Sequence, residues 1–237
     1  MPRPTARLPA IRSSAAPAGD TTQRIAASIT TAIVERRLLP GTKLAEQKIA
    51  DIFKVSRTLV RQAFHQLSRD KLVTLEPARG ARVAEPSVEE ARQVFEVRQM
   101  LEVAMIKRAA AELAPAQIAD LRAHLRAEEA AIRRTDVSGR TRLLADFHVV
   151  VATMLGNEVL AHMLGELVSR SSLIALMYQS AHSAEHSSQE HVAIVDALEK
   201  GDARAAARLM QSHLQHVEQN LRLRPRFPDL AAALQPA

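Results

Sequence analysis

Residues 55–67, VSRTLVRQAFHQL, constrain the fold of this chain most, because they describe one helix with two different faces. Three apolar residues recur at the i, i+4 and i+7 spacing by which a helix packs on a core: Val60, Phe64 and Leu67. Arg57 and Arg61 lie four residues apart and share another face. Ser56 precedes the run and is suited to cap the helix. The stretch predicts a helix that its apolar face holds in place while arginines point outward.

The neighbouring sequence places this helix in a small three-helix unit with a hairpin. Isoleucines at helical spacing predict a first helix that ends near Arg37: Ile25, Ile29 and Ile33. Pro40-Gly41 stops it, and residues 45–53 supply a second, short helix. Residues 72–85, LVTLEPARGARVAE, predict two short strands around a turn in which Gly80 can adopt a left-handed conformation. This order is typical of a winged helix-turn-helix, whose third helix enters the DNA major groove.

The distribution of charge favours a polyanion as the partner of this unit. Residues 21–84 hold twelve Lys and Arg against five Asp and Glu, a net charge of +7. Residues 85–237 carry a net charge of −3. A small basic unit is therefore joined to a larger, mildly acidic body that has a different task.

The composition favours a helical protein of the reducing cytoplasm. One Tyr, no Trp and seven Gly suit helices better than an all-β fold or an enzyme with glycine-rich loops. No Cys is present, which excludes disulfides and thiolate chemistry. No apolar run approaches the roughly 18 residues that cross a bilayer, so we expect no membrane partner. Residues 1–20, with prolines and arginines but no apolar signal core, are expected to form a disordered arm.

The stretch LAEQKIADIFKVSRTLVRQAFHQLSRDKLVTLEPARGARV resembles the DNA-binding domain of GntR-family bacterial transcription regulators. The match includes the VSRT-x-VR segment at the start of the third helix and the R-G-x-x-V end of the wing. The departures are Leu59 for the usual Pro, Gln62 for Glu, and Lys71 where Gly often lies. None of the three removes an expected DNA contact.

The expected DNA contacts lie at the start of the third helix and at the tip of the wing. Arginine and hydroxyl side chains there can bind phosphates or base edges. We expect these residues to contact DNA: Ser56, Arg57, Thr58, Arg61, Arg79 and Gly80. The alternative is a surface helix whose arginines are merely solvated.

From Val88 onward the chain shows helical periodicity and no convincing strand. Helices are expected at about 87–113, 116–134, 140–155, 158–178, 188–199 and 203–222. The segments FEVRQMLEVAMIKRAA, FHVVVATMLGN and EHVAIVDALEKGD resemble the FCD ligand-binding domain of the FadR subgroup.

The expected fold is mainly α, with an N-terminal winged helix-turn-helix joined to an all-α helical-bundle effector domain. The resemblance implies four segments. They are an arm at 1–20, a DNA-binding domain at 21–85, an FCD-type effector-binding and dimerisation domain at 86–222, and a tail at 223–237.

Two histidines are expected to converge on spacing alone. Gly201-Asp202 is a helix stop followed by an N-cap, so the helices on either side of it should form an antiparallel hairpin. His191 lies about 10 residues before this turn and His213 about 11 after it, so both are roughly 16 Å from the turn. Ser187 and Glu190 predict a capping box that places His191 in the first turn of its helix. That boundary leaves His182 and His186 in the preceding loop.

In the family that the chain resembles, three histidines and one aspartate hold a divalent metal. His148, His191 and His213 match the histidine positions. The aspartate position is Leu144 here, and Asp146 should point about 200° around the helix from His148, which makes it a poor substitute. Three imidazoles can bind zinc or nickel with water or an effector carboxylate in the open position, so we expect a divalent metal. The alternative is a hydrogen-bonded histidine pair that lines a pocket or core.

Arg98 matches an arginine that faces the ligand cavity in relatives. A guanidinium binds a carboxylate by two parallel hydrogen bonds, which suits an organic-acid effector. The alternative is a salt bridge to Glu102, four residues further along the helix. Three other histidines are interpreted as surface or packing residues: His124, His162 and His216.

These features predict a homodimeric transcription regulator that is not an enzyme. Its affinity for an approximately palindromic double-stranded DNA operator would be controlled by a small carboxylate effector. One alternative is a zinc-dependent hydrolase that uses the three histidines, although Glu190 should point about 100° away from His191. Another is an effector-independent DNA-binding protein.

Overall fold

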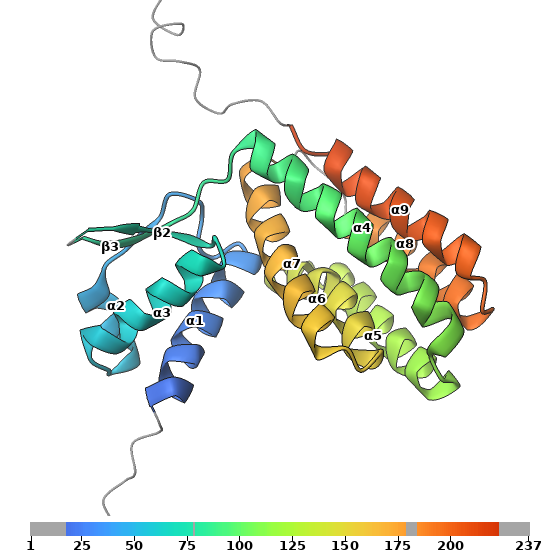
Figure 1. Cartoon of the computed structure of the whole chain (residues 1–237), viewed down its shortest axis with the longest axis horizontal. Coiled ribbons are helices and arrows are strands. Elements are labelled where there is room, and N and C mark those ends of the chain that lie inside the picture. Colours follow the sequence, from blue (N-terminus) through green and yellow to red (C-terminus); the bar gives the residue numbers. More distant parts are fainter. Residues whose placement is uncertain (1–17, 78, 179–183, 223–237) are drawn as a thin grey trace, which may run out of the picture.

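The computed structural model describes residues 18–77, 79–178 and 184–222. Within these residues a winged-helix head and a helical body lie side by side (Figure 1). The head consists of α1 (Ala18–Val34), β1 (Lys43–Leu44), α2 (Glu46–Phe53), α3 (Arg57–Arg69), β2 (Val73–Glu76) and β3 (Gly80–Val83). The body consists of α4 (Val88–Glu112), α5 (Pro115–Arg133), α6 (Val137–Met154), α7 (Glu158–Tyr178), α8 (Ala184–Glu199) and α9 (Ala203–Gln219). The predicted fold class is confirmed. The predicted arm and tail lie outside the described residues, except that α1 begins at Ala18.

The two faces predicted for α3 are both present. Its apolar stripe is fully buried against the isoleucines of α1, with Val60, Phe64 and Leu67 each at most 1 % exposed. The hydroxyl of Ser56 accepts a hydrogen bond from the backbone N–H of Leu59 at 3.4 Å, which confirms the predicted cap. A cap of this kind stabilises a helix by about 1 kcal/mol.

The wing belongs to a three-stranded antiparallel sheet in the order β1-β3-β2. Leu44 pairs with Ala81 and Val73 pairs with Val83 across the central strand β3. Gly80 has a φ of +97°, and a Cβ there would lie 2.4 Å from the carbonyl oxygen of Leu44. Only glycine fits at this turn. The strand β1 was not predicted, because two residues are too few to show an alternating pattern.

Lys71 adopts the left-handed conformation that glycine would supply at this position, with a φ of +59°. A left-handed residue other than glycine costs about 1–2 kcal/mol. The turn between α3 and β2 therefore keeps its geometry despite the substitution.

The body is a bundle whose helices pack in antiparallel neighbours. α4 runs along α9, α6 packs on α5 and α7, and α8 packs on α5 and α9 (Figure 1). Gly201 has a φ of +65°, and the carboxylate of Asp202 accepts a hydrogen bond from the N–H of Ala205 at 2.9 Å. The predicted hairpin of α8 and α9 is thereby confirmed.

The predicted start of α8 is wrong. The helix begins at Ala184, so Ser187 and His186 lie within it and His191 is beyond its first turn. Ser187 is 7 % exposed, and the carboxylate of Glu190 is bonded to His213 and His216 instead of a helix-capping N–H. His182 lies outside the described residues.

The head and the body share part of a core. Leu173 of α7 is fully buried among the core residues of the head, and α1 packs against α6 and α7. The hydroxyl of Ser138 at the start of α6 donates to the carbonyl oxygen of Glu35, which follows α1, at 3.3 Å. These contacts fix the head against the body at one side of the bundle.

Among the described residues, α7 alone is long and apolar enough to cross a membrane by length and composition. Leu164, Leu173 and Ile174 of this helix are fully buried against neighbouring elements. Its apolar character is that of a helix between two packed regions.

Candidate metal centre and DNA-binding face

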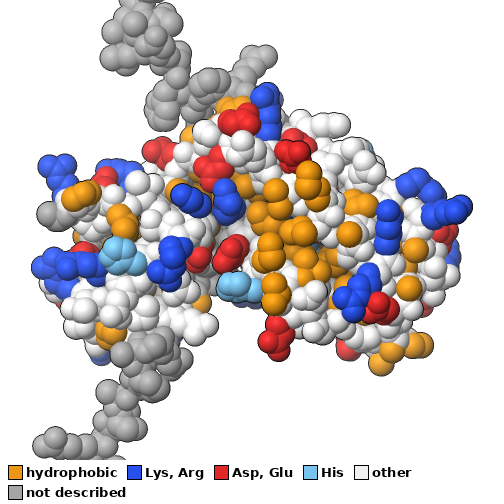
Figure 2. Space-filling view, viewed as in Figure 1, with side chains coloured by type: hydrophobic (Ala, Val, Ile, Leu, Met, Phe, Trp, Pro, Cys, Tyr) orange, Lys and Arg blue, Asp and Glu red, His pale blue; other side chains and the backbone are white. Residues whose placement is uncertain are grey.

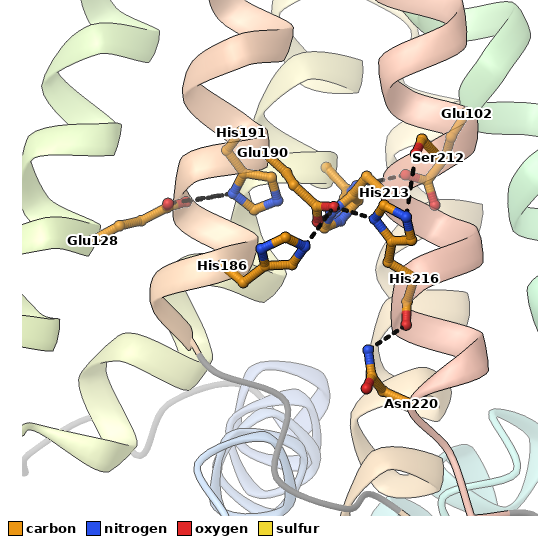
Figure 3. Close-up of polar contacts among 10 residues, drawn as sticks. Glu102, Glu128, His186, Glu190, His191, Ser212, His213, His216 and Asn220 are labelled. Atoms are coloured by element: carbon orange, nitrogen blue, oxygen red, sulfur yellow. Dashed lines mark hydrogen bonds and ion pairs between the residues drawn. The ribbon is translucent and has the colours of Figure 1, made fainter.

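Three histidines from different helices of the body converge on one point. His148 of α6, His191 of α8 and His213 of α9 are 4 %, 1 % and 2 % exposed. Their candidate ligand nitrogens all lie within 4.8 Å of one another. The ring centroids of His191 and His213 are 4.8 Å apart, so the predicted convergence is confirmed (Figure 3).

Each of the three imidazoles has a glutamate at its Nδ1. The Nδ1 of His191 lies 3.0 Å from Oε1 of Glu128, and the Nδ1 of His213 lies 2.7 Å from Oε2 of Glu190 (Figure 3). The third contact joins Nδ1 of His148 to Oε2 of Glu102 at 2.5 Å, a charge contact within the described residues that lacks the geometry of a hydrogen bond. An outer carboxylate on Nδ1 fixes the ring and makes Nε2 the metal-binding nitrogen.

The orientation of His191 leaves a buried nitrogen without a partner. Its Nε2 is fully buried and has no hydrogen bond with any described residue. The ring of Phe147, itself fully buried, stacks on His191 with centroids 4.0 Å apart and an interplanar angle of 14°. Such stacking stabilises an aromatic pair by about 0.5–1.5 kcal/mol and here locks the imidazole plane. A fixed, unpaired imidazole nitrogen is the donor that a metal site requires.

The electrostatics of the site keep the imidazoles neutral and their carboxylates charged. Burial lowers the pKa of His148, His191 and His213, the last to about 4. Burial alone would raise the pKa of Glu190, but hydrogen bonds from His213 and His216 outweigh it and lower that pKa to about 2. Neutral imidazole is the form that binds metal, so the three rings are in the required state at neutral pH.

The position of the missing aspartate is apolar in the structure as well. Leu144 is half-buried and lines the same cavity as His148. Asp146 is exposed and does not belong to any group of side chains able to share a metal among the described residues. The donor set is therefore three imidazoles with an open side toward the cavity, a set that fits zinc with water or a ligand oxygen as the fourth donor.

The open side faces a cavity of about 150 Å³. Arg98 lies in its wall and is 4 % exposed. Its Nε donates to Oε1 of Glu102 at 2.6 Å, so the salt bridge considered from the sequence is present. Its Nη2 is buried and has no hydrogen bond with any described residue. Glu102 therefore anchors Arg98, and one donor of the guanidinium remains available to a ligand.

On the outer face of α3, two arginine side chains are held in place by a glutamate of α2. Arg57 and Arg61, each with 56 % of its side chain exposed, both donate to Glu46 of α2. The Nη2 atoms of both arginines lie 2.9 Å from Oε2 of Glu46. Hydrogen bonds from Arg61 and Arg57 lower the pKa of Glu46 to about 2. Lys and Arg side chains lie on the surface of the head, at the left of Figure 2. Glu46 fixes the side chains of Arg57 and Arg61 in a common direction.

The remaining predicted DNA contacts also lie on the surface of the head. Ser56 and Thr58 are exposed at the start of α3, and Arg79 is exposed at the tip of the wing beside Gly80. The start of α3 and the wing are the two parts with which a winged helix meets DNA.

Sequence reasoning missed the outer shell of carboxylates. Glu128 is fully buried and follows Leu121 and Leu125 on the apolar stripe of α5, and that placement was the available signal. Glu190 was considered only as a capping residue or a base. His216, interpreted as a surface or packing residue, has its Nδ1 2.5 Å from Oε1 of Glu190.

Two families match the chain, one over each part. Residues 21–83 match bacterial regulatory proteins of the gntR family, and residues 93–216 match the FCD domain. The sequence is 29% identical over 191 residues to the HTH-type transcriptional repressor RspR of Escherichia coli K12, covering 80% of this chain and 84% of that protein. It is 27% identical over 203 residues to the HTH-type transcriptional regulator LutR of Bacillus subtilis 168, covering 76% and 92%.

Solved structures agree on the fold. Escherichia coli McbR/YncC superposes with a TM-score of 0.75 at 20% identity, covering 83% of this chain and 94% of that one. A transcriptional regulator GntR from Rhodococcus sp. RHA1 superposes with a TM-score of 0.74 at 25% identity, covering 84% and 96%.

Proposed function

The chain belongs to the GntR family of bacterial regulatory proteins, with an FCD domain as its helical body, and we propose that a small organic acid bound beside the three histidines controls its affinity for DNA. Regulation of transcription through DNA binding is the function of this family. The proposal adds the effector class, the metal, the residues that bind each of them, and the assembly. It also places the protein in the cytoplasm, where its DNA lies.

One observation carries the effector proposal. The cavity brings together the Nη2 of Arg98, which has no hydrogen bond within the described part of the chain, and the open side of the three histidines. A cavity of about 150 Å³ can hold a molecule as large as benzene, so a short organic acid is of suitable size. Arg98 offers a charge-assisted hydrogen bond to one carboxylate. In the proposed site His148, His191 and His213 hold zinc or nickel, and the metal supplies a Lewis-acidic position for a carboxylate oxygen.

On the DNA side, we infer that the start of α3 enters the major groove and that the wing follows the backbone. Arg57 and Arg61 would exchange Glu46 for phosphate or guanine, while Ser56, Thr58 and the Arg79-Gly80 tip bind the backbone. A single winged helix contacts few base pairs, so we propose a homodimer that reads an approximate palindrome.

The test begins with the DNA itself. The purified protein would select duplexes from a random library, and the enriched sequence should contain two half-sites related by approximate two-fold symmetry. Arg57→Ala and Arg61→Ala should each weaken binding to this duplex by about 5- to 150-fold and flatten its dependence on salt. Arg133→Ala is the control, since Arg133 pairs with Glu129 on the exposed face of α5 in the body. Wild-type affinity in both α3 variants would contradict the proposed DNA-binding face.

Two alternative functions were considered, a zinc-dependent hydrolase and an effector-independent DNA-binding protein, and no observation on the described residues favours either of them. A hydrolytic zinc needs a nearby base, and Glu190 is occupied by hydrogen bonds to His213 and His216 on the outer side of the site. An effector-independent DNA-binding protein gives no role to a buried arginine donor that faces a cavity. We therefore propose a regulator without catalytic activity. Operator affinity that is indifferent to every organic acid tested would favour the effector-independent alternative.

A further inference from the structure

A second group of potential metal donors lies about one helical turn from the three histidines. His186 and Glu190 are four residues apart on α8 and so share a face, and His216 follows His213 by three residues on α9. The candidate donor atoms of His186, Glu190 and His216 all lie within 4.8 Å of one another. Within the described part of the chain, two groups of side chains are thus placed to share a metal, and both use the α8–α9 hairpin.

Both imidazoles of this second group meet the same carboxylate oxygen (Figure 3). Nε2 of His186 lies 3.2 Å from Oε1 of Glu190, and Nδ1 of His216 lies 2.5 Å from the same atom. Zinc with bonds of about 2.0–2.1 Å in tetrahedral geometry separates its donors by about 3.3 Å. The spacing between His186 and Glu190 already suits a metal, and His216 has to withdraw by less than about 1 Å to admit one.

The kinds of donor decide which metals this group suits. Two imidazoles and one carboxylate are ligands of zinc, and imidazole also suits nickel and copper. Magnesium and calcium prefer oxygen ligands alone, so a set with two nitrogens selects against them. Water would complete the coordination of a metal held by three side chains.

Exposure separates the two groups. The side chains of His186 and His216 are 51 % and 44 % exposed, and that of Glu190 is 15 % exposed. The side chains of the three inner histidines are at most 5 % exposed. A metal ion can therefore reach the second group, and leave it, without any opening of the bundle.

Glu190 connects the two groups. Its Oε2 lies 2.7 Å from Nδ1 of His213, whereas its Oε1 faces His186 and His216. One carboxylate is thus the outer partner of an inner histidine and also a donor of the second group. A metal on Oε1 would hold the carboxylate that orients His213.

We propose that His186, Glu190 and His216 form a second, exchangeable site for a divalent metal such as zinc, on the surface of the α8–α9 hairpin. The metal lies between the two imidazoles and Oε1 of Glu190, and water fills its open position. This inference goes beyond the proposed function, because it requires neither an effector nor a metal at the three inner histidines. It makes the concentration of free metal a second signal that the body can receive.

The experiment counts zinc on the tag-free, full-length protein. Metal-free protein is titrated with Zn²⁺ by equilibrium dialysis, and bound zinc per chain is measured by elemental analysis. Wild type should bind about two equivalents, a tight one and a weaker one that desalting removes, and excess Mg²⁺ should displace neither. His186→Ala and His216→Ala should each abolish the weaker equivalent. Each variant should keep the tight equivalent, which shows that its bundle is folded.

The matched control is a histidine–glutamate pair that lacks a third donor. His162 and Glu166 are four residues apart on α7, and Nε2 of His162 lies 3.2 Å from Oε1 of Glu166, the same distance as between His186 and Glu190. Among the described residues this pair belongs to no group that could share a metal. His162→Ala should therefore keep both equivalents.

Zinc binding that is undiminished in His186→Ala or in His216→Ala would overturn the inference. Loss of the weaker equivalent in His162→Ala as well would also overturn it, because zinc would then bind exposed histidines in general. The inner metal is tested separately, since His191→Ala should remove the tight equivalent and keep the weaker one. If wild type lacks a tight equivalent but holds zinc that both outer variants lose, the inference stands and the metal of the proposed function fails.

Discussion

The head and the body each use glutamates to hold their functional side chains, but in opposite surroundings. In the head, Glu46 binds Arg57 and Arg61, whose side chains are 56 % exposed. In the body, Glu102 and Glu128 are fully buried behind histidines that are at most 5 % exposed at the side chain. The same residue type therefore serves one network whose arginines lie in water, although Glu46 itself is only 11 % exposed at the side chain, and another that lies wholly in the core.

The surroundings decide what each network can do. An exposed ion pair contributes about 0–1 kcal/mol and is screened by salt, so phosphate can replace Glu46 at little cost. Breaking a buried pair leaves an uncompensated group and costs about 3–5 kcal/mol. The network of the head is thus suited to exchange partners on each binding event. The network of the body is suited to keep one geometry.

The largest effect should come from removing a histidine of the body. His191→Ala or His213→Ala should abolish tight zinc or nickel binding, because the two imidazoles that remain are too few protein donors for a stable site. Metal per chain, measured by elemental analysis after purification without chelator, should fall from near one to near zero. His162→Ala is the control, since His162 is exposed and pairs only with Glu166 among the described residues. An unchanged amount of metal per chain in both variants would contradict the proposed metal site.

A smaller effect should follow from the outer carboxylate. Glu128→Gln keeps the shape of the side chain but weakens the hold on Nδ1 of His191, so metal affinity should fall by about 10- to 100-fold. Competition with a colorimetric chelator measures this ratio. Glu129→Gln, on the exposed face of the same helix, should leave the affinity as it is. An equal affinity in the Glu128 variant would mean that packing by Phe147 alone orients the ring.

The smallest effect should come from the head. Glu46→Gln should lower the free energy of unfolding at pH 7 by less than about 1 kcal/mol, since its partners are exposed. The pKa of Glu46 is lowered to about 2 from an ordinary value near 4.5, so its stabilisation is present above pH 4.5 and is lost as the pH falls toward 2.

Urea unfolding of wild type and variant at pH 7 and near pH 3 measures this prediction. The difference between the two proteins should shrink at the lower pH. A difference of several kcal/mol in the free energy of unfolding at pH 7, as large as that expected for a buried pair, would contradict the proposed difference between the networks of the head and the body.

Local patterns predicted much of this molecule. The stripe of α3, its Ser56 cap and the turn at Gly80 depend on neighbours in sequence, and all three were predicted. The convergence of His191 and His213 followed from counting residues from one turn, because α-helical rise is constant.

Long-range contacts were less accessible. Glu128 on α5 and His191 on α8 are 63 positions apart, and no local pattern relates them. The early start of α8 was missed because Ser187 resembles a cap, whereas in the fold it faces the cavity from within the helix. Arg36 follows α1 and lines the cavity of the body. The sequence did not predict this, because the direction of a turn after a helix depends on the elements packed around it.

Leu173 has a consequence for how such proteins change during evolution. This side chain belongs to the body but completes the core of the head, where it is fully buried. A DNA-binding unit transplanted from a relative by joining the chains at the linker must also offer a hollow that accepts Leu173. Without one, an apolar side chain would face water at a cost of about 1.5–3 kcal/mol. Substitutions on the outer face of α3 do not require a hollow for Leu173, so operator specificity can change through them with fewer constraints.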